Sequence, residues 1–255
     1  MIVVLLATVV IGVWLLYTPS GLLGKADAIG YAVCHRIELR SFHLGVRQLP
    51  LCARCSGMYL GALTGVAFYL LRHPKAGFYP GRSVRGVLVL FVLIWALDGL
   101  NSFLHLFPTA PHVYPPSNTL RVITGALLGV SLATLVYPAF NQYAWKEWKR
   151  EIILPTFRDL VYLLGLILGI IVAVLSGNPL ILYPLALLSV FSVLALLTAV
   201  YSTVVLTITR KENRAISWRD LVLPLLLGLT FAVTQIAVID LVRYWMTGTW
   251  EGFHF

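Results

Sequence analysis

Long unbroken runs of apolar residues are the feature of this sequence that most limits how the chain can fold. A helix needs about twenty apolar residues to cross the hydrocarbon core of a bilayer. Seven runs of this kind are present, over residues 1–17, 50–71, 86–107, 120–141, 159–177, 180–208 and 220–245. Only 11% of the residues are charged, against roughly a quarter in soluble domains. We therefore predict an all-α fold, a polytopic membrane helix bundle of about seven transmembrane helices, with residues 1–255 forming a single integral membrane domain.

Several classes of protein are excluded by the same pattern. The runs are continuous, whereas the strands of a transmembrane β-barrel alternate apolar and polar residues. The first run, residues 1–17, lacks the positively charged start of a signal peptide, so we expect it to remain as a span. No phosphate-cradling glycine loop, nucleophile elbow or haem-attachment motif is found. The basic residues flank the apolar runs, which argues against a nucleic-acid partner.

Basic residues between the runs predict the orientation of the chain. Three loops, 72–85, 142–158 and 209–219, fall on one face of a seven-span bundle and hold 12 of the 19 basic residues. The positive-inside rule makes that face cytoplasmic. The N-terminus is then cytoplasmic, the C-terminus is external, and segment 18–49 lies outside.

Segment 18–49 is expected to lie at the external membrane interface and to lead into the second span. Residues 27–39 have the apolar spacing of a short interfacial helix, and residues 41–49 alternate around Gly45 as a hairpin does. The stretch from residue 18 to residue 54 has an excess of basic residues, namely Lys25, Arg36, Arg40, Arg47 and Arg54 against Asp27 and Glu38. We interpret this excess as binding anionic lipid headgroups or an anionic substrate, or as neutralising thiolates. A solvated loop is the plainer alternative.

The three cysteines of the chain lie close together in the sequence and predict one site. Cys34 is followed at once by His35, and Cys52 and Cys55 stand three residues apart at the start of the second span. The positive N-terminal end of a helix, together with nearby arginines, lowers the pKa of a thiol. Zn²⁺ prefers a tetrahedral set of sulfur and nitrogen ligands. Candidate ligands are Cys34, His35, Cys52 and Cys55, with His105 or water as an alternative fourth ligand.

A redox function is the competing interpretation of these thiols. A Cys-x-x-Cys pair at the outer end of a membrane helix suits a quinone-coupled thiol oxidoreductase, with Cys52 and Cys55 as the active pair. Such an enzyme normally needs a second pair, and Cys34 supplies only half of one. Unpaired structural thiols are the third possibility.

Asp98 is the strongest candidate for a catalytic residue, because an acidic group within a span is costly and usually functional. It shares a helix face with Asn101, Ser102 and His105. No cation is close to it in the sequence, so its partner must come from another helix. Arg36, Arg40 and Arg54 are the candidates, and the same three arginines are candidates for binding an anionic cofactor or substrate. Asp240 and Arg243 fit a local pair that anchors the last helix.

Glycines at four-residue spacing predict close helix packing. Gly57, Gly61 and Gly65 form one such stripe, and small residues at this spacing let two backbones approach. The pairs Gly125/Gly129 and Gly165/Gly169 repeat the pattern.

The cysteine segment resembles a known family. Its Cys34-His35, Arg40-Ser41-Phe42 and Pro50-Leu-Cys-Ala-Arg-Cys-Ser-Gly-Met-Tyr-Leu-Gly61 match the signature Cys-His, Arg-Ser-Phe and Pro-x-Cys-Ala-Arg-Cys-Ser/Thr-Gly-x-Tyr-x-Gly. This signature is typical of a family of bacterial and archaeal multi-pass membrane proteins catalogued as a domain of unknown function. The resemblance implies a prokaryotic plasma-membrane protein and brings no activity.

Three functions remain open at this point. The first is a membrane protein with an outward-facing Cys/His metal site, with zinc as the expected ion, either structural or acting on an anionic lipid-linked substrate beside Asp98. The second is the quinone-coupled oxidoreductase. The third is a non-enzymatic subunit of a larger membrane assembly. Whether the protein is an enzyme is left undecided by the sequence.

Overall fold

The computed structural model describes residues 2–107, 109 and 111–253. Met1 of the first predicted span therefore lies outside the described residues. The elements follow in this order: α1 (Ile2–Tyr17), α2 (Leu22–Val33), the short 3-10 helix η1 (Glu38–Arg40), β1 (Ser41–Leu44), β2 (Arg47–Cys52), α3 (Ala53–Arg72), β3 (Ala76–Phe78), α4 (Arg82–Leu104), α5 (Asn118–Ala144), β4 (Lys149–Ile152), α6 (Phe157–Leu175), α7 (Pro179–Ile208) and α8 (Trp218–Thr247).

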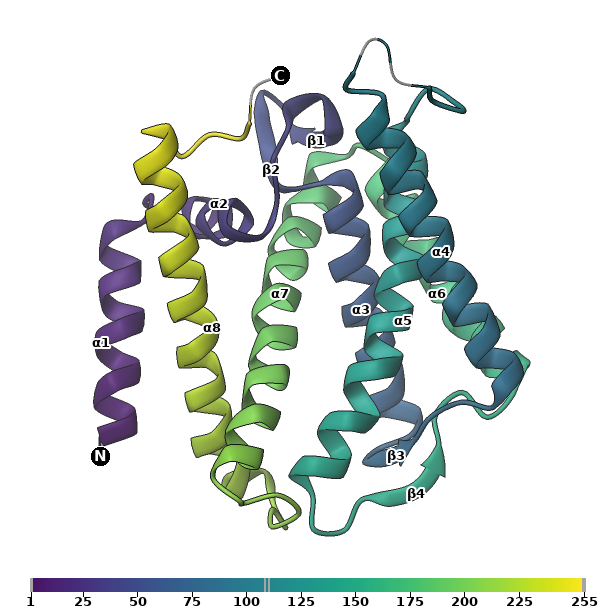
Figure 1. Ribbon diagram of the computed structural model, residues 1–255, viewed down its shortest axis with the longest axis vertical. Coiled ribbons are helices and arrows are strands. Elements are labelled where there is room, and N and C mark those ends of the chain that lie inside the picture. The colour runs from purple at the N-terminus through teal and green to yellow at the C-terminus, as the bar shows by residue number, and fades with distance from the viewer. Residues whose placement is uncertain (1, 108, 110, 254–255) are drawn as a thin grey trace.

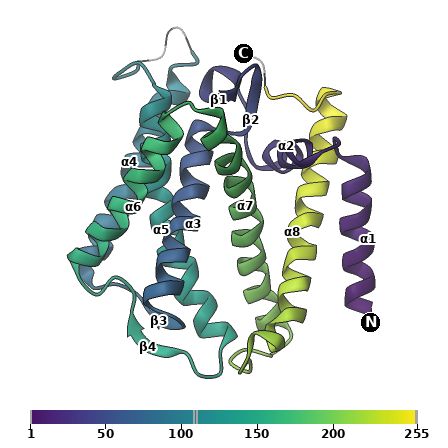
Figure 2. The same cartoon turned by 180° about the vertical axis from the view of Figure 1, so that it is seen from behind.

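The protein is a helical membrane bundle, as predicted. Its long helices run side by side, with α3 between α5 and α7 in both views (Figures 1 and 2). The short helix α2 lies across this direction, because the chain bends by 103° between α1 and α2. The predicted hairpin is present as the antiparallel pair β1 and β2, with Gly45 at φ 63° in its turn.

The number of spans differs from the sequence prediction. Of the helices in the described part of the chain, five are long and apolar enough to cross a membrane, namely α4, α5, α6, α7 and α8, and the bent pair α1 and α2 counts as a sixth if it is one span. The predicted span 50–71 corresponds to α3, which is not among them. Arg54 and three glycines reduce the apolar character of α3, so its place in the bundle depends on contacts with other helices.

Glycine contacts join α3 to α5 at the centre of the bundle. A Cβ added at Gly57 or Gly61 would overlap the backbone of α5, and one added at Gly125 or Gly129 would overlap the backbone of α3. The prediction of close packing is confirmed for these stripes. It is wrong for Gly165 and Gly169, which have no atom within 4 Å of an added Cβ. These two glycines of α6 leave open space beside the helix.

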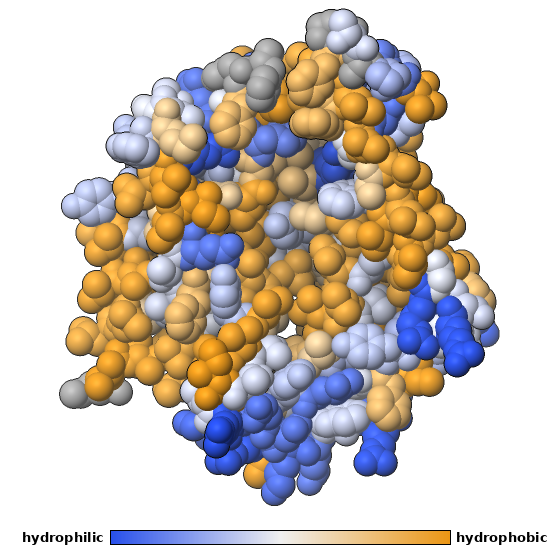
Figure 3. Space-filling model, viewed as in Figure 1, coloured by the Kyte–Doolittle hydropathy of each residue, from blue (hydrophilic) through white to orange (hydrophobic). Residues whose placement is uncertain are grey.

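The three basic loops lie together at one end of the molecule. The backbone N–H of Lys149 donates to Lys75 O at 2.8 Å, and that of Lys146 donates to Ala215 O at 2.9 Å. The parallel pair of β3 and β4, which the sequence did not predict, belongs to this end. The β1–β2 hairpin lies at the opposite end (Figure 1). In the space-filling view, hydrophilic residues concentrate at the two ends and the middle is mostly apolar (Figure 3).

Candidate metal centre

The three cysteines reach one place because two short elements end there. Helix α2 ends at Val33, and Cys34 follows in extended backbone at φ −139° and ψ 146°. The predicted helix over 27–39 is therefore too long at its C-terminal end. The hairpin then returns the chain, so that Cys52 ends β2 and caps α3 while Cys55 lies in the first turn of α3.

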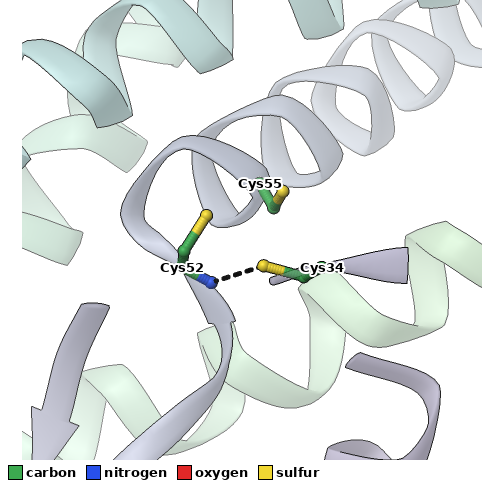
Figure 4. A group of neighbouring side chains, drawn as sticks. All are labelled: Cys34, Cys52 and Cys55. Atoms are coloured by element: carbon green, nitrogen blue, oxygen red, sulfur yellow. Dashed lines mark hydrogen bonds between the residues drawn. The ribbon is translucent and has the colours of Figure 1, made fainter. Parts of the chain in front are cut away.

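The three sulfur atoms form a compact group. The Sγ atoms of Cys34, Cys52 and Cys55 all lie within 4.8 Å of one another. Figure 4 shows the Cys34 side chain directed toward the start of α3. Cys34 is 6% exposed and Cys52 is 2% exposed. Among the described residues, this is the only group of three or more potential ligands of this kind.

Backbone amides point at the sulfur of Cys34. The N–H of Cys52 donates to Cys34 Sγ at 3.3 Å, and the N–H of Arg36 donates to the same atom at 3.5 Å. Side-chain hydrogen bonds from Cys52 and then Cys55 hold the pKa of Cys34 well below its ordinary value, although burial acts to raise it. Hydrogen bonds to the charged form are what stabilise a thiolate. The site therefore favours the thiolate form of Cys34, the form that binds metals, whereas the hydrogen bond with Cys34 raises the pKa of Cys52, and the hydrogen bonds with Cys34 and Cys52 raise the pKa of Cys55.

The turn that carries Cys34 is held from several sides. Arg36 adopts a left-handed backbone conformation at φ 52°, which is uncommon for a residue other than glycine. Its side chain is buried, and its guanidinium pairs with Asp27 Oδ1 at 3.0 Å and donates to Trp250 O at 3.2 Å. Gln48 Nε2 donates to Arg36 O at 2.8 Å. These contacts maintain the strained turn that presents the Arg36 amide to sulfur.

Arg243 of α8 also holds this turn, a role that the sequence analysis did not predict. Its guanidinium donates to Cys34 O at 2.7 Å and to His35 O at 3.2 Å, and it lies 4.0 Å from the ring centroid of Tyr31. Asp240 instead accepts a hydrogen bond from Trp14 Nε1 at 3.1 Å. The local pair expected between Asp240 and Arg243 is thus replaced by two separate long-range contacts. A basic residue near the end of a long apolar helix was the available signal, but its target lies 209 residues away.

The two predicted histidine ligands lie outside the sulfur group. His35 is next to Cys34, but its Nδ1 accepts a hydrogen bond from the backbone N–H of Ile37 at 2.9 Å. His105 follows the last residue of α4, and its ring packs against that of His112 at a centroid distance of 4.5 Å. The structure thus brings together the three cysteines and neither imidazole.

Asp98 of α4 lies in a separate polar network that includes Arg54 of α3. It is 3% exposed and forms an ion pair with Arg54, one of its three predicted partners. Tyr114 Oη donates to Asp98 Oδ1 at 2.8 Å, and Thr124 Oγ1 donates to Asp98 Oδ2 at 3.2 Å. Both carboxylate oxygens are therefore engaged. Asp98 does not belong to the sulfur group.

The surroundings of the thiols are apolar. Cys34 and Cys52 belong to a buried cluster with side chains from α1, α2, α7 and α8 as well as β2. Structural zinc sites are closed in this way, whereas catalytic zinc sites keep an open position for water. This arrangement suits an ion that holds elements together better than one that activates water.

An apolar cavity lies between α3, α5, α7 and α8. Its volume is about 1060 Å³. The lining of α3 begins at Ala62, which is about 10 Å along the helix from Cys55 at 1.5 Å per residue. The cavity is therefore separate from the sulfur group.

Comparisons with known proteins place the site in a family of unknown function. The model of the family described as "Predicted membrane protein (DUF2085)" matches residues 34–135. An uncharacterized protein of Methanocaldococcus jannaschii is 28% identical over 48% of this chain and 72% of its own length. An uncharacterized protein of Methanothermobacter thermautotrophicus is 31% identical over 40% of this chain and 83% of its own length. No solved structure matches the chain.

Proposed function

We propose, from the premise that this chain belongs to the DUF2085 family of predicted membrane proteins, that Cys34, Cys52 and Cys55 bind one metal ion. Zinc is the expected ion, because thiolate ligands suit it. The ion joins the end of α2 to the start of α3 and so fixes the hairpin between them. In this role the protein is a membrane protein with a structural metal centre, either alone or as a subunit of a larger assembly.

One observation carries this proposal: three sulfurs from two separate stretches lie within 4.8 Å of one another in a buried setting. Packing alone gives three reduced thiols little reason to lie so close together. Thiolates at this distance repel one another unless a cation lies between them. A divalent cation removes that repulsion. The guanidinium group of Arg243, which holds the Cys34 turn, offsets part of the remaining negative charge.

The chain supplies three ligands, and zinc takes four in structural sites. His35 is the candidate for the fourth because it adjoins Cys34 and its Nε2 is not the nitrogen that accepts from Ile37. Water is the alternative. Hydrolysis of a lipid-linked substrate beside Asp98 receives no support, since Asp98 is fully engaged by Arg54, Tyr114 and Thr124.

Metal analysis of the purified protein tests the proposal. Protein purified without added metal should contain about one zinc per chain, and Cys34→Ser, Cys52→Ser and Cys55→Ser should each lose it. His105→Ala is the matched control and should keep the ion, because His105 packs on His112 away from the sulfur group. His35→Ala tests the fourth ligand. Metal-free protein with reduced thiols would overturn the proposal.

A quinone-coupled thiol oxidoreductase is the second candidate. The closeness of Cys52 and Cys55 permits a disulfide after modest movement, and the apolar cavity of about 1060 Å³ between α3, α5, α7 and α8 offers room for a quinone ring and its isoprenoid tail. Metal-free protein with a Cys52–Cys55 disulfide, detected by mass spectrometry, would favour this function over the metal centre.

We propose that the thiol end of the bundle faces outward from the plasma membrane and that the three basic loops face the cytoplasm. The loops gather at one end and the hairpin lies at the other, which supports a single orientation (Figure 1). An alkaline phosphatase fusion after α8 should be active, and the same fusion in the loop between α7 and α8 should be inactive. The reverse result would invert the orientation.

A further inference from the structure

We propose that the guanidinium groups of Arg40, Arg54 and Arg121 form a binding site for a phosphate group, hereafter the arginine site. Arg40 and Arg54 of this site contact Ser102 of α4, and the site shares no residue with the proposed metal centre. Of its three arginines, only Arg40 and Arg54 were candidates for binding an anion from the sequence. The third arginine and the shape of the site come from the structure.

Three separate elements bring these arginines together. Arg40 ends η1, Arg54 lies in the first turn of α3, and Arg121 lies in the first turn of α5. Arg40 Nη2 donates to Ser102 O at 2.8 Å, and Arg54 Nη2 donates to Ser102 Oγ at 3.1 Å. The two guanidinium groups therefore meet on one residue of α4.

Arg121 lies one turn before Thr124 in α5, and the hydroxyl of Thr124 donates to Asp98 Oδ2 at 3.2 Å in the same network. The Arg121 side chain is held by Asn118, whose Oδ1 accepts from Arg121 Nη1 at 2.8 Å. Asn118 in turn donates to Leu39 O at 3.3 Å, beside Arg40. Both ends of the site are thus fixed by hydrogen bonds before any ligand arrives.

Positive charge exceeds negative charge in this group. Asp98 pairs with Arg54, and within the described residues neither Arg40 nor Arg121 has an ion-pair partner. Arg121 is 6% exposed, and the Nε atoms of Arg54 and Arg121 are buried without a hydrogen-bond partner. Burial, and then the charge of Arg54, lower the pKa of Arg40. Uncompensated buried charge is costly, so an anion that supplies acceptors here would be bound favourably.

Two helix N-termini add to the positive potential. Helices α3 and α5 run in the same direction and begin at this end of the bundle (Figure 1). Gly125, which has no side chain, allows α5 to approach the carbonyl of Arg54. The N-terminus of a helix carries partial positive charge and free N–H groups that suit an anion. The dipoles of both helices therefore favour the same ligand as the three guanidinium groups.

A phosphate group fits this site better than a carboxylate does. Guanidinium forks match phosphate oxygens in bidentate geometry, and a phosphate offers enough oxygens to engage three arginines. Two of the three positive charges remain after Asp98 is counted, which a phosphate monoester can balance. The phosphate can belong to a lipid headgroup, since the site lies at the end of the membrane helices, or to free phosphate.

Calorimetric titration of the full-length protein in uncharged detergent tests the arginine site. The probes are inorganic phosphate and short-chain phosphatidic acid. We expect saturable binding, weakened about tenfold in Arg121→Gln and in Arg40→Gln, since a hydrogen bond to a charged group contributes about 1.5–3 kcal/mol. Arg82→Gln is the matched control, because Arg82 is exposed at the far end of α4 and should bind as the wild type does.

The outcomes distinguish the two sources of phosphate and include results that overturn the proposal. Binding of phosphatidic acid at concentrations where inorganic phosphate does not bind identifies a lipid headgroup, and equal binding of the two probes identifies a phosphate ion. Absence of saturable binding of both probes overturns the proposal, as does equal binding by the wild type and both variants. Each variant is first checked for an unchanged metal content and melting temperature. If Arg121→Gln does not fold, phosphate binding by Arg40→Gln decides the test, because Arg40 is less buried.

Discussion

The part of the chain that matches the family and the part that follows it are built in different ways. Residues 34–135 contain the thiols, Asp98 and the three arginines, and their helices α3 and α5 touch backbone to backbone through glycines. Residues 136–253 contain α6, α7 and α8, where Gly228 of α8 lies close to the backbone of α7, whereas Gly165 and Gly169 of α6 have no atom within 4 Å of an added Cβ. Helices α6 and α8 begin with capping boxes, whereas α3 begins at Cys52 with no side-chain cap.

This difference separates the part of the chain that carries the proposed sites from the part that supports them. The proposed thiol ligands and the three arginines of the arginine site all lie in the family part. The later helices contribute from outside: Arg243 holds the Cys34 turn, and Gly252 lies so close to Arg36 O that a side chain there would clash. The second part thus supports the first through these contacts. Four changes test this division.

Loss of the buried carboxylate should have the largest effect. Asp98→Asn leaves Arg54 without its charge partner, and breaking a buried pair costs about 3–5 kcal/mol. We expect the free energy of unfolding in detergent to fall by that amount. Asp220→Asn, at the exposed start of α8, should have a much smaller effect. A change below 1 kcal/mol for Asp98→Asn would show that the family part does not depend on this pair.

One added methyl group should distinguish α5 in the first part from α6 in the second. Gly125→Ala places a Cβ against the Arg54 carbonyl and should cost about 1–3 kcal/mol, as overpacked cores do. Gly169→Ala meets open space and should be neutral or slightly stabilising, because alanine favours helix more than glycine does. Thermal unfolding of the two variants side by side measures the contrast. Equal effects would remove the distinction in packing.

The contact between Arg243 and the Cys34 turn should affect metal affinity, although Arg243 supplies no ligand. Arg243→Gln removes the charge that holds Cys34 O and His35 O, and zinc affinity should fall about tenfold, as it does when outer partners of metal ligands are lost. Competition with a chromophoric chelator measures this affinity. Arg219→Gln, exposed at the other end of α8, is the control. Unchanged zinc affinity in Arg243→Gln would mean that the second part does not support the site.

A local cap in the second part should have the smallest effect. Thr156→Ala removes the capping box of α6 and should cost about 1 kcal/mol of unfolding free energy. Metal content and phosphate binding should remain at wild-type levels, because α6 contributes no residue to either site. Loss of either property would show that the two parts are coupled more tightly than the contacts indicate.

The sequence was sufficient for the features that depend on local chemistry. The spacing of Cys52 and Cys55 at a helix start places them in one turn, and the alternation around Gly45 returns the hairpin, so the meeting with Cys34 was predictable. The prediction of a helix over residues 27–39 was wrong at its C-terminal end. The helix ends at Val33, and Arg36 adopts a left-handed backbone conformation.

The features that depend on distant contacts were out of reach. Arg243 has an acidic residue three positions away, so a local pair was the simplest interpretation, and its true partners lie near residue 34. His105 shares a helix face with Asp98, but its ring is held by His112 in the following loop. The count of seven spans took α3 as apolar throughout, although its glycines and Arg54 serve contacts with α5 and α4.

The contact between Arg243 and the Cys34 turn has a consequence for biosynthesis. The ribosome makes the thiol segment early, and Arg243 emerges 209 residues after Cys34. Until α8 enters the membrane, that side of the turn stays open to solvent or lipid. The proposed zinc ion would therefore be loaded best during translation, and once enclosed it would exchange slowly with the medium.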